Sequence, residues 1–115
     1  MRQIIKQVLK KITNKPHYVG TAEHEKVQFY IVSQLLELGL ETEIQDQVAL
    51  NKKWNAGANT QNILARIKGT DNGKALLLLT HYDSQPHSSL GASDAGSGVV
   101  TILEGLRAYL VNNKQ

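Results

Sequence analysis

Cysteine is absent from this sequence, which excludes disulfide bonds and metal sites built from thiolates. Aromatic side chains are scarce, with one tryptophan, one phenylalanine and four tyrosines among 115 residues. No apolar run approaches the length of a membrane span, and no signal-peptide pattern precedes a small-residue cleavage site. The length and the single hydrophobic pattern predict one compact unit, or part of one. Any metal site must use nitrogen and oxygen ligands.

Acidic residues are missing from the first fifteen positions, which hold five basic ones. The formal net charge is +3, so the rest of the chain carries about −2. A basic amphipathic helix of this kind can contact nucleic acid or a membrane surface. A solvated helix face is the simpler interpretation, because no aromatic residues alternate with the charges. We therefore expect no nucleic-acid partner.

Hydrophobic periodicity predicts the order helix, helix, strand, strand, strand, helix. Thr21 is the expected N-cap of the second helix, and Gly39 is its expected C′ residue. Asn72-Gly73 predicts a tight hairpin turn into the third strand. The other expected ranges are a helix at 2–13, strands at 40–50, 61–68 and 74–80, a loop at 51–60, and a final helix after Asp94.

The five apolar residues Ala75 to Leu79 predict a strand that is covered on both faces. The polar cluster His81-Tyr82-Asp83-Ser84 follows at its carboxyl end, where open α/β sheets place their binding sites. Asp94 stands at the start of the last helix. We therefore expect His81 and Asp94 to lie at the rim of one crevice.

His81 and Asp83 are spaced as a metal ligand and the carboxylate that receives its second N–H group. Asp94 fits either a simple N-cap or a bridge between two hard cations. Gly96 and Gly98 weaken the first turn of the helix, so close approach of another part of the chain is expected there. We interpret Tyr82 as a packing residue, and the other histidines, His17, His24 and His87, as surface or loop residues.

Two other motif interpretations fail on spacing. The glycine-rich segment before the last helix has no following lysine, which a phosphate-binding P-loop requires. Ser97 lacks the flanking glycines of a nucleophile elbow, because its neighbours at those positions are Ala95 and Val99.

Three segments together resemble the zinc-dependent M28 peptidase family: His81-Tyr82-Asp83-Ser84, Gly91-Ala92-Ser93-Asp94 and Gly96-Ser97-Gly98-Val99. The upstream segments Pro16 to Thr21 and Asn62-Ile63-Leu64-Ala65 are also similar to that family. The branch that resembles the chain most is that of the endoplasmic-reticulum metallopeptidase and its bacterial relatives. The resemblance thus implies a parent protein joined to membrane spans, with a peptidase domain outside the cytoplasm.

The resemblance implies roles for individual residues. His81 becomes a ligand of one zinc ion, Asp94 the carboxylate that bridges two zinc ions, and Asp83 the catalytic-site carboxylate that orients His81. Ala95 departs from the Asp or Asn that many members have after the bridging aspartate. The family's remaining ligands and its glutamate base correspond to positions beyond Gln115.

The expected fold class is therefore α/β: an incomplete three-layer α/β/α sandwich with a mixed sheet, in which residues 1–115 form the amino-terminal part of a single peptidase domain. The expected function is that of a partial catalytic domain of an aminopeptidase-type zinc enzyme that acts on peptides, with the isolated chain inactive. The alternative is a non-catalytic α/β binding or scaffold module that retains the fold. The sequence leaves peptide specificity and oligomeric state open.

Overall fold

The N-terminal helix and its successor begin and end where the sequence predicts. In α2 the backbone N–H of His24 donates to Thr21 Oγ1 at 3.1 Å, so Thr21 is the N-cap. Gly39 follows the helix with a positive φ of 79°, which a residue without a Cβ adopts at little cost. The computed structural model describes residues 2–53, 56–70, 73–84 and 90–112, with the elements α1 Arg2–Ile12, α2 Ala22–Glu37, β1 Glu41–Asn51, β2 Ala56–Arg66, η1 Ala92–Gly96 and α3 Ser97–Asn112.

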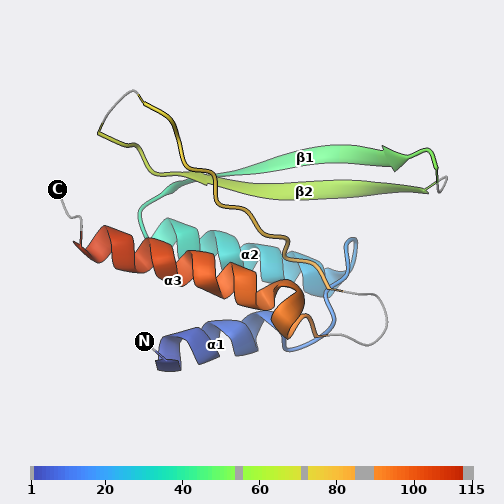
Figure 1. The fold of residues 1–115 in the computed structure, drawn as a ribbon. Helices are drawn as coiled ribbons and strands as arrows, with labels where there is room; N and C mark the ends of the chain where they lie inside the picture. The colour runs from blue at the N-terminus through green and yellow to red at the C-terminus, as the bar shows by residue number, and fades with distance from the viewer. Residues whose placement is uncertain (1, 54–55, 71–72, 85–89, 113–115) are drawn as a thin grey trace.

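The three helices pack together and share one apolar core (Figure 1). α3 lies beside α1 and its residues Val99, Val100 and Leu103 are buried, which matches the predicted amphipathic helix. Each helix contributes the apolar stripe that its periodicity indicates. The core residues are Val8, Ile12, Val27, Ile31, Leu35, Leu40, Val99, Val100 and Leu103.

β1 and β2 form a two-stranded antiparallel sheet in which Glu41 is opposite Arg66 and Asn51 is opposite Ala56. Figure 1 shows all three helices on one side of this long hairpin. The predicted loop at 51–60 is wrong, because β2 already begins at Ala56. The sequence there is rich in small and polar residues with weak strand propensity, and pairing with β1 overrides that preference. Trp54 lies outside the described residues.

The predicted third strand is not formed: residues 73–84 carry no strand in the part of the chain that the structure describes. The expected burial is also wrong, because Leu76 and Leu79 are 86% and 77% exposed. A central strand needs hydrogen-bonding neighbours and covering layers, and apolar character alone supplies neither. The described residues thus show a two-stranded sheet with helices, and the three-strand order and the sandwich are not confirmed. Asn72, in the predicted turn, is outside the described residues.

Candidate metal centre

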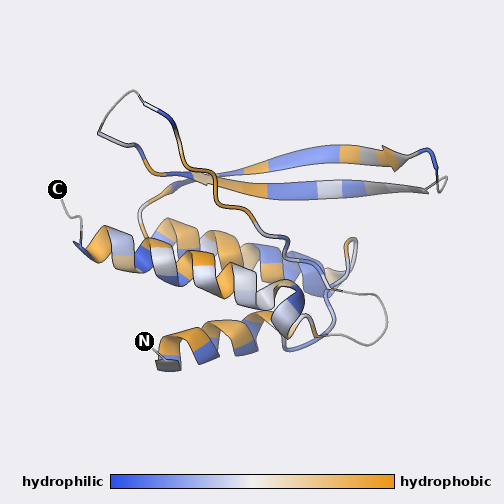
Figure 2. Ribbon diagram, viewed as in Figure 1, coloured by the Kyte–Doolittle hydropathy of each residue, from blue (hydrophilic) through white to orange (hydrophobic). Residues whose placement is uncertain are grey.

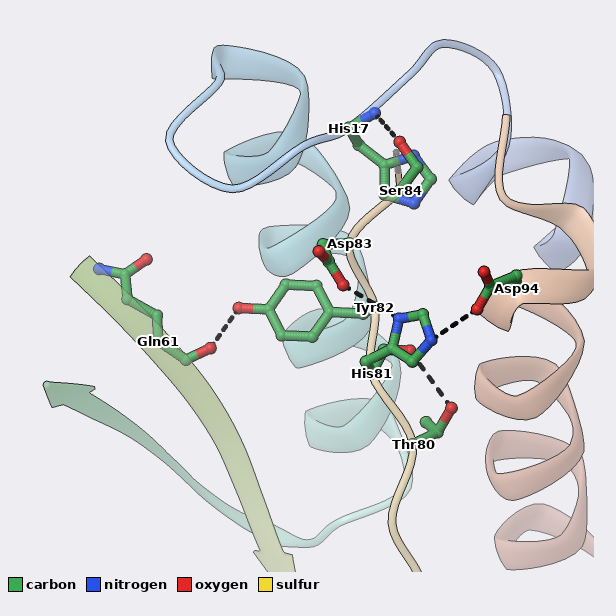
Figure 3. A network of polar contacts seen from close by, with 8 residues as sticks. All are labelled: His17, Gln61, Thr80, His81, Tyr82, Asp83, Ser84 and Asp94. Atoms are coloured by element: carbon green, nitrogen blue, oxygen red, sulfur yellow. Dashed lines mark hydrogen bonds and ion pairs between the residues drawn. The ribbon is translucent and has the colours of Figure 1, made fainter. Parts of the chain in front are cut away.

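His81 lies between two carboxylates that come from different parts of the fold (Figure 3). Its Nε2 atom is 2.8 Å from Asp94 Oδ1, and its Nδ1 atom is 3.0 Å from Asp83 Oδ1. The side chains of His81 and Asp94 are 53% and 69% exposed, so this group is open to solvent. The structure therefore brings together all three residues that the sequence analysis selected.

Tyr82 and Ser84, the residues that alternate with His81 and Asp83, hold the segment in place. Tyr82 O–H donates to the carbonyl of Gln61 at 2.5 Å and accepts from Gln28 Nε2 at 3.2 Å. Its ring stacks on His24 with centroids 4.7 Å apart. Tyr82 is therefore a packing residue, as predicted, and it ties the segment to β2 and α2.

Ser84 provides a second attachment, to the connector between α1 and α2. The backbone N–H of His17 donates to Ser84 Oγ at 2.6 Å, and the N–H of Ser84 donates to the carbonyl of His17 at 3.3 Å. Both residues are buried: His17 is 2% exposed and Ser84 is 4% exposed. This reciprocal pair fixes the backbone immediately after Asp83 (Figure 3).

Asp94 lies in η1, a wide turn that precedes α3. Its φ and ψ of −123° and 84° are not helical, and its carboxylate bonds to His81. Asp94 is therefore not the N-cap of α3, whose first residue is Ser97. The turn is closed by the N–H of Gly96, which donates to the carbonyl of Gly91 at 2.6 Å.

The two glycines at the start of α3 are explained by close contacts, as expected. A Cβ on Gly96 would lie 2.7 Å from the Gly91 carbonyl and 3.1 Å from Leu9 on α1. A Cβ on Gly98 would collide with the side chain of Thr80. These contacts let the turn that carries Asp94 approach both α1 and the residue before His81.

Burial and the two neighbouring carboxylates shift the pKa of His81 in opposite directions. Partial burial lowers the pKa of His81, but the hydrogen bonds to Asp94 and Asp83 together outweigh it and raise the pKa above its ordinary value. Burial lowers the pKa of His24, against a smaller opposing effect of Asp83. His24 thus favours the neutral form.

The prediction of a surface or loop position is wrong for His24, which is buried in α2. His17 does lie in a loop, between α1 and α2, but it is buried there. A signal for His24 was present, because it precedes the core residues Val27 and Ile31 by three and seven positions on α2. No comparable periodicity marks His17, whose burial depends on the distant Ser84. His87 is outside the described residues.

The donor set fits a zinc ion in part. An imidazole and a carboxylate within reach of each other, with a second carboxylate on the far imidazole nitrogen, form a typical zinc arrangement. The crevice beside them has a volume of about 90 Å³ and is lined by Tyr18, His81, Asp83, Ser84 and Asp94. Within the described ranges no third ligand joins them, since no group of three or more candidate side chains occurs there.

Known proteins resemble this chain in sequence and in fold. Residues 62–115 match the model of "Peptidase family M28". A vacuolar membrane protease of Candida tropicalis is 36% identical over 116 residues, which cover 93% of this chain and 13% of that protein. The chain belongs to peptidase family M28. It spans about an eighth of the length of the curated relatives that it matches.

Solved structures with the same fold accompany this M28 assignment. A glutaminyl cyclase of Porphyromonas gingivalis superimposes with a TM-score of 0.86 at 28% identity and covers 100% of this chain, which spans 41% of the cyclase. A Zn-dependent exopeptidase of Parabacteroides distasonis superimposes with a TM-score of 0.62 at 19% identity, over 90% of this chain and 40% of that one. The latter likeness concerns the fold alone.

Proposed function

We propose that this chain forms the amino-terminal part of the catalytic domain of a zinc-dependent exopeptidase. The observation that supports this most is the placement of His81 between Asp83 and Asp94, with both imidazole nitrogens within hydrogen-bond distance of a carboxylate. Membership of family M28 gives the reaction class, which is the hydrolysis of peptides. Aminopeptidase-type specificity and two zinc ions are the finer parts of the proposal.

In this proposal His81 and Asp94 hold zinc, which when bound supplies Lewis-acid polarisation of the scissile carbonyl and activation of water. Asp83 accepts the Nδ1 proton of His81, so that Nε2 presents its lone pair to the metal. Asp94 adds negative charge that favours the cation. Tyr82 and Ser84 keep the backbone of this segment fixed while ligands and substrate exchange.

The isolated chain is proposed to be inactive because, within the described ranges, no further carboxylate joins these ligands to act as a base. Glu104 is the single acid that follows Asp94 in the sequence, ten residues further along. At a rise of about 1.5 Å per residue, the seven residues from Ser97 to Glu104 place its Cα about 10 Å along α3 from the turn that carries Asp94. Glu104 is also paired with Arg107, at 2.9 Å from Nε. A general base must lie within hydrogen-bond reach of its proton.

The parent protein is proposed to be attached to a membrane, because relatives that match most of this chain are vacuolar membrane proteases. None of the helices in the described ranges has the length and apolar character that a bilayer crossing needs. Assignment to the endoplasmic-reticulum branch of the family stays a prediction.

The test compares zinc binding and hydrolysis in the 115-residue chain and in its longer parent protein. Calorimetric titration should show weak zinc binding by the chain, lost in His81→Ala and Asp94→Asn and retained in Asp46→Asn, a matched change on exposed β1. Aminoacyl chromogenic substrates should be hydrolysed by the parent alone. Turnover by the isolated chain that His81→Ala abolishes would contradict the proposed inactivity, and equal zinc binding by all variants would contradict the site.

A second candidate function is cyclisation of amino-terminal glutamine. It is favoured by the superposition of the whole chain on a glutaminyl cyclase at 28% identity. Both activities are compatible with ligands at His81 and Asp94. The parent protein should therefore also be incubated with a glutaminyl peptide: release of ammonia without peptide cleavage would support the cyclase and contradict the peptidase.

A further inference from the structure

The face of α1 that points away from the other helices is strongly basic. Lys6, Lys10 and Lys11 are all exposed, and we call these three residues the basic face. Lys6 and Lys10 are four positions apart, so they stand one above the other along the helix. The opposite side of α1 is apolar and contributes Val8 and Ile12 to the core. Figure 2 shows this division between hydrophilic and hydrophobic positions on α1.

In the part of the chain that the structure describes, no ion pair involves the basic face. The ion pairs found among the described residues involve Lys26, His81 and Arg107, and none involves α1. The sequence also places no acid within the first fifteen residues, while the rest of the chain is net negative by about two charges. The positive potential is therefore concentrated at one side of the molecule, next to α1.

We propose that the basic face of α1 is a docking surface for the headgroups of an anionic lipid membrane. This inference goes beyond the proposed peptidase function and does not depend on it. A negatively charged leaflet attracts each nearby lysine with a similar binding free energy, and these contributions add when the helix lies parallel to the surface. Three lysines, all on the exposed side of one helix, meet that geometry.

Lipid is favoured over nucleic acid by what else lies on α1. Ile4 is 40% exposed on the same helix, and an apolar side chain beside lysines can enter the interfacial region of a bilayer. α1 carries no aromatic residue on which bases would stack. Docking through α1 would also direct the β1–β2 hairpin away from the membrane, because α2 and α3 lie between them (Figure 1).

The experiment measures co-sedimentation of the 115-residue chain with vesicles of phosphatidylcholine, with or without a minority of phosphatidylserine. Binding should require phosphatidylserine and should vanish near 1 M salt, where the Debye length is about 3 Å. The triple variant Lys6→Gln, Lys10→Gln, Lys11→Gln should bind about 100-fold more weakly, at about fivefold for each lysine. Glutamine is a good helix former, so α1 should persist, and circular dichroism checks this.

The matched control removes the same charge elsewhere, by Lys52→Gln, Lys68→Gln and Lys74→Gln at exposed positions outside α1. This control should lose much less affinity than the α1 variant. Equal losses in the two triple variants would overturn the proposal, because binding would then follow net charge alone. Displacement by inorganic phosphate at constant ionic strength would indicate a free-anion site instead. Tighter binding to a DNA duplex than to the vesicles would assign the basic face to nucleic acid.

Discussion

Residues 75–79 and 80–84 are consecutive, yet they contribute to the fold in opposite ways. The first segment is apolar and exposed, with Leu78, its least exposed leucine, still 56% exposed. The second is polar and is attached to the body of the molecule through Tyr82 and Ser84. A polar segment is thus fixed by contacts within this chain, while an apolar segment is left uncovered. The comparison teaches that hydrogen bonds and the packing of one aromatic ring, rather than burial of the apolar run, position the site.

The contrast also separates two requirements of a metal centre. The ligands must be held in position, and the sheet beneath them must be complete. The first requirement is met by His17, Gln28 and Gln61, which hydrogen-bond to Ser84 or Tyr82. The second is not met within the described residues, where β1 and β2 form the whole sheet. The exposed leucines are an apolar patch of the kind that marks a contact surface.

The largest expected effect comes from removing the attachment. Tyr82→Ala should lower the free energy of unfolding of the 115-residue chain by about 2–3 kcal/mol, because it removes the stack on His24 and leaves Gln28 with one partner fewer. Tyr82→Phe keeps the ring and should cost about 1 kcal/mol. Urea unfolding measures both. Equal small losses would mean that Tyr82 does not anchor the segment.

The next effect concerns the exposed side of the same segment. Asp83→Asn should weaken zinc binding by about 10–100-fold, since an amide no longer fixes the tautomer and orientation of His81. Unfolding of the zinc-free chain should change little, because Asp83 is not among the anchoring residues. Calorimetric titration provides the measurement, with Asp46→Asn as the matched control. An unchanged affinity would show that Asp83 is a loop acid without a role at the site.

A smaller effect concerns pH and the buried His24. Burial lowers its pKa in the folded chain, so the unfolded state binds more protons below the unfolded value of about 6.5. The stability associated with neutral His24 is therefore complete above about pH 6.5 and is lost as the pH falls through the lowered folded pKa. His24→Gln should reduce this loss between pH 7.5 and 5, measured by urea unfolding at each pH. His81 has a raised pKa and acts in the opposite direction, and its contribution cancels when the two proteins are compared.

The smallest effect is expected in the apolar segment. Leu78→Ala should change the stability of the 115-residue chain by less than about 0.5 kcal/mol, because the side chain is largely exposed. Leu103→Ala, the same change at a buried position, should cost about 2–5 kcal/mol. If the longer parent covers this segment, Leu78→Ala should become costly there. A large loss in the chain itself would contradict the exposed conformation.

Sequence reasoning predicted the helices, and the proximity of His81, Asp83 and Asp94, better than it predicted the sheet. Helical periodicity and the Thr21 cap are local signals, so α1 and α2 could be located accurately. His81, Asp83 and Asp94 could be grouped because their spacing resembles a family motif. The start of β2 at Ala56 depends on pairing with β1, which is not a local property. Leu76 to Leu79 were expected to be buried because an apolar run was assumed to have neighbours.

The alternation along residues 81–84 has a consequence for protein engineering. His81 hydrogen-bonds to Asp83 and Asp94, whereas Tyr82 and Ser84 hydrogen-bond to Gln61 and His17 (Figure 3). Because the hydrogen bonds of Tyr82 and Ser84 anchor the segment, His81 and Asp83 can be exchanged for other ligand types while the backbone stays anchored. Soft or hard donors introduced at positions 81 and 83 would therefore change metal preference without a new scaffold. In this segment, the ligand chemistry and the structural support can therefore be varied independently.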